Sequence, residues 1–115
     1  MAKNEKAIQP EDLDRLFLER ANSGDLDGVV SLYDTNAQLA LPSGEIVSGA
    51  NNIRRVYEEL LAAKTQFQGE VQPAIRNGNI ALTSTRLPKG ITIEVAQRQP
   101  DGSWLWIIDQ PNIRF

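Results

Sequence analysis

The chain has 115 residues, of which 41% are hydrophobic and 23% charged, a composition that predicts one ordinary globular domain. It contains no cysteine and no histidine. Disulfides, thiol nucleophiles and cysteine-bound metals are therefore excluded, and acid–base chemistry would have to use Asp, Glu, Tyr or Lys. A formal net charge of −3, without a cluster of Lys or Arg, argues against nucleic acid as a partner.

No apolar run approaches the ~18 residues that a membrane-spanning helix needs. The first residues also lack the apolar core of a secretory signal. We therefore expect a cytoplasmic protein without membrane contact, with a flexible N-terminal tail over residues 1–8 and a single domain over residues 9–115.

Two helices are expected first. Pro10 and the acids that follow it are typical of a helix start. Gly24 is placed to end this helix, and Asp25 to cap a second, short helix whose apolar face includes Tyr33 as a packing residue. The buried face of the first helix is predicted to consist of Leu13, Leu16, Phe17 and Ala21.

A third helix is expected after two short strands, over residues 39–41 and 45–47. Ser48 is predicted to cap this helix, which fades near Lys64. Its buried face is predicted to consist of Ile53, Val56, Tyr57, Leu60 and Leu61.

The second half of the chain reads as four antiparallel strands within residues 67–115. Asn77-Gly78 is a strong hairpin signal, and Pro100-Asp101-Gly102 is a second one. The order of elements predicts an α+β domain in which a curled antiparallel sheet wraps around three N-terminal helices.

Three segments carry a resemblance to a known superfamily: SGDLDGVVSLYDTNAQLALPSG at 23–44, SGANNIRRVY at 48–57 and DGSWLWIIDQPN at 101–112. With the strands between them, they make residues 10–113 resemble the nuclear transport factor 2-like superfamily, and most closely its ketosteroid isomerase-like and SnoaL-like branch. The resemblance implies a cone-shaped, cystatin-like fold with a small-molecule pocket. It does not imply one reaction, because this fold hosts isomerases, cyclases, dehydratases, hydrolases and binding modules.

The resemblance can be checked residue by residue against the ketosteroid isomerases. Their tyrosine in the first helix is matched by Phe17, and their aspartate base before the strand's proline is matched by Leu41. Their protonated acid in the third strand of the meander is matched by Glu94, and their supporting tyrosine by Tyr57. Steroid isomerisation is not expected, because phenylalanine cannot donate a hydrogen bond and leucine cannot accept a proton.

A replacement acid–base pair is predicted on the last two strands. If Asp101-Gly102 forms a two-residue turn, the register places Glu94 opposite Asp109 on one face of the sheet. A three-residue turn with a bulge would alter this pairing. Two facing carboxyl groups in a semi-apolar pocket would hold one proton, and with Tyr57 as a hydrogen-bond donor they form the candidate catalytic set.

A structural interpretation of the same residues stays open. Asp109 could bond a backbone group or an arginine, and Glu94 could face solvent or pair with Arg86 or Arg98. Tyr57 is equally consistent with a core residue and with a ligand contact.

A cavity wall of apolar groups with a few hydroxyls is also predicted, unless these side chains simply fill the core. The predicted lining residues are Phe17, Leu41, Thr83, Thr85, Leu87 and Ile107.

The last strand is apolar on both faces. Trp104, Trp106 and Ile108 are expected to share the face turned away from the pocket, where either a helix or a second subunit would cover them. Members of the superfamily that the chain resembles commonly pair through this sheet face, so the resemblance implies a homodimer. The expected ligand is an unknown small apolar or semi-polar molecule. The two functional hypotheses are a proton-transfer enzyme that needs no metal or cofactor, and a non-catalytic homodimeric module for ligand binding or protein association.

Overall fold

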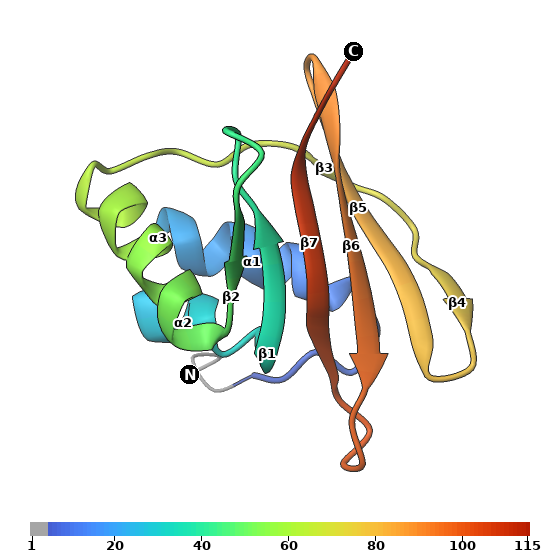
Figure 1. Cartoon of the computed structure of the whole chain (residues 1–115). Coiled ribbons are helices and arrows are strands. Elements are labelled where there is room, and N and C mark those ends of the chain that lie inside the picture. Colours follow the sequence, from blue (N-terminus) through green and yellow to red (C-terminus); the bar gives the residue numbers. More distant parts are fainter. Residues whose placement is uncertain (1–4) are drawn as a thin grey trace.

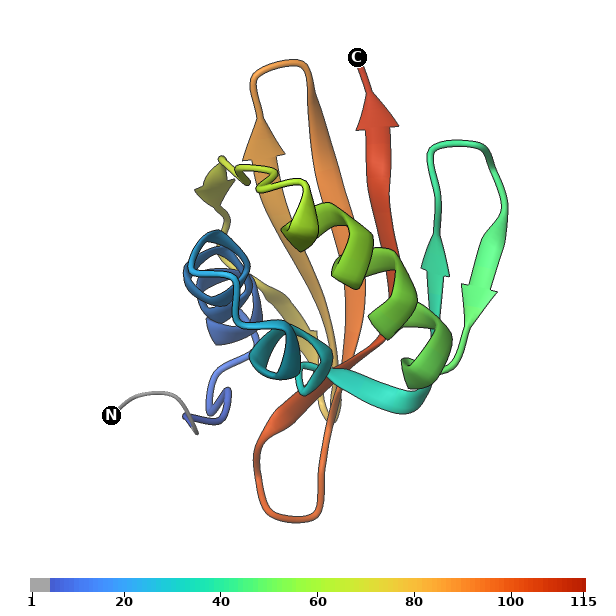
Figure 2. The ribbon, with the colours of Figure 1, turned by 90° about the vertical axis from the view of Figure 1, so that its left-hand side faces the viewer.

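The structure is a computed structural model that describes residues 5–115. Three helices and a curled seven-stranded sheet confirm the predicted α+β architecture. The helices gather on the concave side of the sheet (Figures 1 and 2). The elements in chain order are α1 (Asp12–Asn22), α2 (Leu26–Val30), β1 (Tyr33–Ala40), β2 (Ile46–Ser48), α3 (Ala50–Ala62), β3 (Glu70–Val71), β4 (Ile75–Asn77), β5 (Ile80–Leu87), β6 (Gly90–Arg98) and β7 (Trp104–Arg114).

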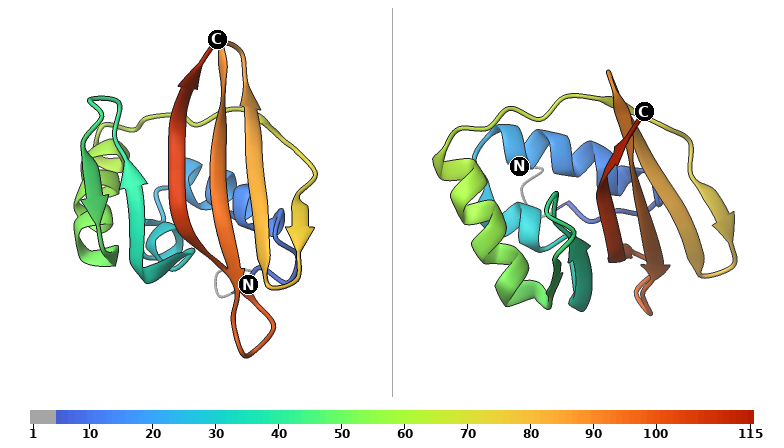
Figure 3. Two further views of the ribbon diagram at one scale, coloured as in Figure 1. Left: turned by 45° about the vertical axis from the view of Figure 1, so that its right-hand side comes forward. Right: turned by 45° about the horizontal axis from the view of Figure 1, so that its top comes forward.

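The sheet has the strand order β2-β1-β7-β6-β5-β3, and β4 also pairs with β5. Neighbouring strands are antiparallel except for β1 and β7, which run parallel. The strongly curved sheet partly encloses α1 and α3 (Figure 3). This curvature creates the space in which the candidate site lies.

The first two helices follow from local signals. Leu13 and Leu16 are almost fully buried on α1, and Gly24 follows that helix with a φ of 76°, which glycine adopts without strain. The Asp25 side chain accepts a hydrogen bond from the Gly28 N–H and so caps α2 as predicted. No helix within residues 5–115 has the length and apolar character needed to cross a membrane.

The prediction that Tyr33 lies on the second helix is wrong. α2 ends at Val30, and Tyr33 is the first residue of β1, paired with Trp106 of β7. Local spacing could not reveal this pairing, because its partner lies more than seventy positions further along the chain. Ser48 likewise does not cap α3, since it ends β2 and its hydroxyl donates to Gln38.

The two predicted hairpins are both present. Asn77 pairs with Ile80 across the first turn. In the second turn the Gln99 N–H donates to the Ser103 carbonyl at 2.7 Å, so the turn contains three residues, with Gly102 at a φ of 89°. Of the two turns considered from the sequence, the three-residue turn is therefore the one present.

A bulge in β7 restores the register that the longer turn shifts. Ala96 pairs with Trp106, but the next residue back along β6, Val95, pairs with Ile108, so Ile107 is the extra residue. Beyond the bulge, Glu94 pairs with Asp109. The predicted opposition of these acids is present, although it arises from two one-residue shifts that cancel.

The same bulge overturns the predicted faces of β7. Trp104 and Trp106 are 1% and 2% exposed and belong to the core on the helix side, whereas Ile108 is 48% exposed. The prediction that these three residues share the outer face is wrong for both tryptophans. The physical reason is that an extra residue reverses the in–out alternation of a strand.

Residues 5–8 contribute to the packed part of the chain. Ala7 is 2% exposed, and its carbonyl accepts a hydrogen bond of 2.9 Å from the Trp104 N–H. Residues 1–4 of the predicted tail lie outside the described residues.

Candidate functional site

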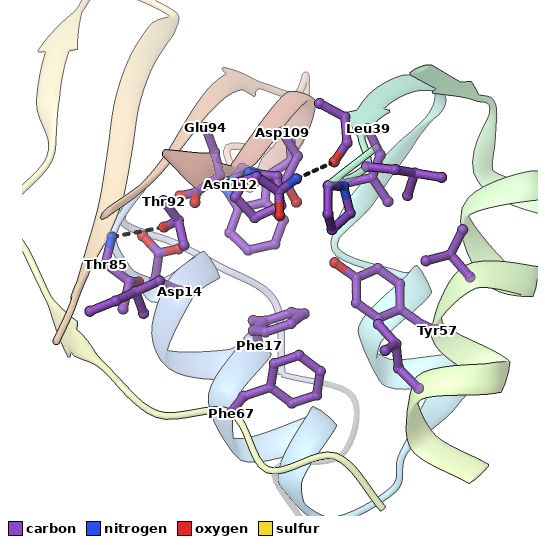
Figure 4. Close-up of a pocket in the computed structure, with 18 of the residues that line it drawn as sticks. Asp14, Phe17, Leu39, Tyr57, Phe67, Thr85, Thr92, Glu94, Asp109 and Asn112 are labelled. Carbon is purple, nitrogen blue, oxygen red and sulfur yellow. Dashed lines mark hydrogen bonds between the residues drawn. The ribbon is translucent and has the colours of Figure 1, made fainter. Parts of the chain in front are cut away.

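A cavity of about 390 Å³ lies between the concave side of the sheet and helices α1 and α3. Most of its wall is apolar, and a few polar groups converge on one side of it (Figure 4). The lining residues are Asp14, Phe17, Leu18, Leu39, Ala40, Leu41, Pro42, Val56, Tyr57, Glu59, Leu60, Phe67, Gln68, Thr85, Leu87, Thr92, Glu94, Trp106, Asp109, Pro111, Asn112 and Arg114.

Three buried carboxyl groups reach this cavity from three different elements. Glu94 of β6 and Asp109 of β7 are cross-strand partners, and Asp14 comes from α1. Their exposed fractions are only 3%, 4% and 3%, respectively. Glu94 and Asp109 were expected here, but the sequence reasoning missed Asp14.

A signal for Asp14 was available in the sequence. Asp14 lies three residues before Phe17 and seven before Ala21, so it falls on the apolar stripe of α1 rather than on its solvated face. An acid on a buried stripe is rarely tolerated without a partner or a function.

The Glu94 carboxyl group is held by a short chain of hydrogen bonds. The Thr83 hydroxyl donates to Glu94 Oε1 at 2.6 Å, and Trp106 Nε1 donates to the same Thr83 oxygen at 3.0 Å. Burial, followed by the negative charge of Asp14, raises the pKa of Glu94 far above its usual range. Burial also raises the pKa of Asp14, against the opposing effect of a hydrogen bond from Glu94. The two groups therefore titrate as a pair that retains one proton near neutral pH.

Asp109 is linked to two buried tyrosines. The Tyr33 hydroxyl donates to Asp109 Oδ2 at 2.5 Å, and the Tyr33 and Tyr57 oxygens are 2.8 Å apart. Because the single hydroxyl hydrogen of Tyr33 goes to Asp109, Tyr57 must donate to Tyr33. The Tyr57 oxygen is then left with acceptor capacity for the cavity.

Burial, followed by the charge of Glu94, raises the pKa of Asp109 to about 8, while the hydrogen bond from Tyr33 opposes the rise. Asp109 is thus mostly protonated at neutral pH. Burial also raises the pKa of both Tyr33 and Tyr57, so their hydroxyls stay neutral.

Two buried carboxyl oxygens of residues that line the cavity have no hydrogen-bond partner within the described residues. They are Asp14 Oδ2 and Asp109 Oδ1. A buried polar atom without a partner costs free energy, so a bound molecule that reached these atoms would gain hydrogen bonds. No cluster of acidic side chains in residues 5–115 is spaced to hold a metal ion.

Aromatic rings form much of the remaining wall. The centroid of the Phe17 ring lies 5.6 Å from that of Tyr57, 5.2 Å from that of Phe67 and 6.0 Å from that of Trp106. Two hydrogen bonds between the Asn22 side chain and the Phe67 backbone fix the segment that carries Phe67. Phe17 and Phe67 lie across the cavity from Glu94 and Asp109 (Figure 4).

The predicted lining residues divide into two groups. Phe17, Leu41, Thr85 and Leu87 line the cavity. Thr83 is fully buried and bonded to Glu94, and Ile107 occupies the bulge of β7; neither of these two is among the lining residues.

The alternative interpretation, in which Glu94 and Asp109 have only structural roles, predicted other contacts for these two acids than the structure has. Glu94 is not turned to solvent, and no ion pair found in residues 5–115 joins Glu94 or Asp109 to Arg86 or Arg98. Asp109 bonds a tyrosine rather than a backbone group or an arginine.

The model of the SnoaL-like domain family matches residues 15–106 of the chain. The chain belongs to the SnoaL-like domain family. The matched region contains Glu94, Asp14 lies one residue before it, and Asp109 follows it closely. None of the curated proteins compared with the chain matches it.

Solved structures similar to this SnoaL-like domain share its fold at low sequence identity. A protein of unknown function with a cystatin-like fold from Nostoc punctiforme has a TM-score of 0.76 at 14% identity, covering 91% of this chain and 75% of that one. A ketosteroid isomerase-like protein from Erwinia carotovora atroseptica has a TM-score of 0.72 at 17% identity, covering 92% and 94%. A SnoaL-like protein of unknown function from Burkholderia thailandensis has a TM-score of 0.61 at 18% identity, covering 85% and 88%.

Proposed function

We propose that this SnoaL-like domain binds a small, partly apolar molecule in the cavity, and that the buried carboxyl groups exchange a proton with it. The observation that carries the proposal is the meeting of Asp14, Glu94 and Asp109 in one cavity with two buried oxygens unpaired. Buried acids whose pKa values are pushed apart by their surroundings are typical of acid–base sites.

The roles follow from the protonation states. Asp109 retains its proton near neutral pH and would act as the acid through Oδ1, since Oδ2 is occupied by Tyr33. The Asp14–Glu94 pair holds one proton and one negative charge, so its free oxygen, Asp14 Oδ2, would act as the base. Tyr57 would accept rather than donate a hydrogen bond, which differs from the donor role expected from the sequence.

Binding can be tested with a thermal-shift screen of small neutral and charged compounds. Leu41→Trp is designed to obstruct the cavity, because Leu41 lines it. Ile46→Trp is the matched control on the neighbouring strand, where Ile46 is 58% exposed. We expect compounds that stabilise the wild type and Ile46→Trp but not Leu41→Trp. If no compound stabilises either the wild type or Ile46→Trp, the proposal of a small-molecule site is contradicted.

Proton exchange can be tested on any compound that the screen finds. The compound is incubated with the protein in deuterated water, and the loss of its C–H signals is followed by nuclear magnetic resonance. We expect exchange with the wild type and strong slowing in Asp109→Asn and Glu94→Gln. Equal exchange rates in all three proteins would contradict a role for these acids.

The second hypothesis, a homodimeric association module, is favoured by a row of aliphatic side chains on the convex face of the sheet. Ile75, Leu82, Val95 and Ile108 are register partners across β4, β5, β6 and β7. Ile75 and Ile108 are 70% and 48% exposed, which is a suitable surface for a second copy of the chain. We propose a homodimer through this row, which is compatible with the cavity function.

The dimer proposal can be tested by analytical ultracentrifugation at micromolar concentration. Ile108→Lys should give a monomer, whereas Ile46→Lys, at an exposed position on the edge strand β2, should leave the dimer intact. A wild-type protein that sediments as a monomer would contradict the proposal.

A further inference from the structure

We infer that the ligand of this cavity is an apolar organic cation, with a primary ammonium group at the carboxyl groups and a hydrocarbon or aromatic body against the opposite wall. The inference rests on the proposed small-molecule function of the cavity and names the class of molecule. Three features of the cavity support it.

The first feature is the pair of unpartnered oxygens. Asp14 Oδ2 and Asp109 Oδ1 both belong to side chains that are at least 96% buried, and both residues line the cavity. An ammonium group has three N–H donors and no acceptor, so it can donate to Asp14 Oδ2 and, once Asp109 has lost its proton, to Asp109 Oδ1. A ligand carbonyl could accept from protonated Asp109, but it would leave Asp14 Oδ2 unpaired.

The second feature is that no buried cation is found among the described residues that line the cavity. Within residues 5–115, the charged lining residues are Asp14, Glu94, Asp109 and the exposed Glu59, against one exposed cation, Arg114. A cavity with this imbalance attracts cations and repels carboxylates and phosphates, because the low dielectric of the interior strengthens these effects. A bound cation would also pair with the negative charge that the Asp14–Glu94 pair retains.

The third feature is the wall that faces the acids. Phe17 and Phe67 lie opposite Glu94 and Asp109, and Tyr57 and Trp106 extend this aromatic surface. Aromatic rings attract cations and also bury apolar groups. The cavity therefore has one carboxyl-rich side and one aromatic side, which matches an amphiphilic molecule with a single charged end.

A cation would also change the protonation of the site. Asp109 is mostly protonated near neutral pH, and the Asp14–Glu94 pair retains one proton. A positive charge beside these groups favours their ionised forms, so binding should release protons to the solvent. A neutral ligand in the same place would not have this effect.

The experiment uses three probes with one aromatic body: 2-naphthylmethylamine, 2-naphthylmethanol and 2-naphthoate. Their binding to the full chain is measured by isothermal titration calorimetry at about pH 7, in two buffers that differ in ionisation enthalpy. We expect the amine to bind about tenfold or more tightly than the alcohol. One charge-assisted hydrogen bond contributes enough binding free energy to change the affinity by about that factor. The naphthoate should bind more weakly than both, and the amine enthalpy should depend on the buffer in the direction of proton release.

Two variants separate the charge from the cavity. Asp109→Asn and Asp14→Asn should each weaken amine binding about tenfold and change alcohol binding much less. Glu58→Gln, an exposed acid on α3, is the matched control and should change neither. If either Asn variant fails to fold, the other still tests the inference.

The outcomes distinguish the inference from the function on which it rests. Alcohol or naphthoate binding as tight as amine binding, or amine binding without proton release, overturns the cation inference and leaves the small-molecule site standing. Failure of all three probes also overturns the inference. The proposed function itself fails only if the wider thermal-shift screen finds no compound that Leu41→Trp excludes.

Discussion

Replacing Asp109 by asparagine should leave the stability nearly unchanged near pH 4 and should raise it increasingly, relative to the wild type, as the pH rises to about 8. Burial raises the pKa of Asp109 to about 8, from the ordinary aspartate value of 3.8. Between these two values the unfolded chain has lost this proton while the folded chain retains it. The free energy of unfolding therefore falls as the pH rises, by up to about 1.4 kcal/mol per pH unit.

Over the whole interval the loss amounts to about 6 kcal/mol, which is comparable to the total stability of many domains. Asparagine has nearly the shape of the protonated acid and does not ionise in this range, so Asp109→Asn escapes the loss. The variant should match the wild type near pH 4 and exceed its free energy of unfolding by several kcal/mol above pH 8. The Tyr33 hydroxyl can still donate to the amide oxygen.

Urea denaturation at a series of pH values measures this difference, provided that both proteins show equal m values. Glu58→Gln serves as the control, because this acid is exposed and does not line the cavity. If Asp109→Asn were less stable than the wild type by a constant amount, or by an amount that grows with pH, Asp109 would be ionised and stabilised in the folded state. The argument for the protonated acid would then be refuted.

Three further changes test the packing and the hydrogen bonds around the site. Tyr33→Phe removes the hydrogen bond that lowers the pKa of Asp109, so the pKa of Asp109 should rise further. The carboxyl resonances in a pH titration measure this pKa. An unchanged pKa would mean that Tyr33 does not donate to Asp109. Thr83→Val removes a donor to Glu94 and should raise the pKa of Glu94 while costing about 1–3 kcal/mol of stability; a lowered pKa would show that another group governs it. Leu13→Ala, at a fully buried position of α1, should cost about 2–5 kcal/mol in urea denaturation; a cost well under 1 kcal/mol would mean that the core does not pack around this residue.

Much of the fold could be predicted because its signals are local. The apolar spacing of α1 and α3 and the caps around Gly24 and Asp25 act within a few residues, and they agree with the structure. The hairpin at Asn77-Gly78 is also a short-range preference of the backbone. These local signals failed at Tyr33. It was expected at the end of a helix, but it begins a strand that pairs with the distant β7.

The candidate site was only partly predictable. Glu94 and Asp109 could be proposed because they are acids in apolar strands, and the structure does pair them. The predicted register was conditional on a two-residue turn, whereas the turn has three residues, and the position of the bulge at Ile107 was not foreseen. The shifts from the turn and from the bulge cancel at Asp109. Between the turn and the bulge only the shift from the turn applies, and it reverses the predicted faces of β7. For this reason Trp104 is in the core.

The amino-acid pattern by itself determined which residues could form helices and hairpins, and it excluded histidine and cysteine chemistry. Only the tertiary structure decided which acids meet. Asp14 reaches Glu94 because α1 packs across the curved sheet, bringing together residues eighty positions apart. Such contacts depend on sheet curvature and on a bulge whose position no short-range preference specifies, and the protonation of the site depends on them in turn.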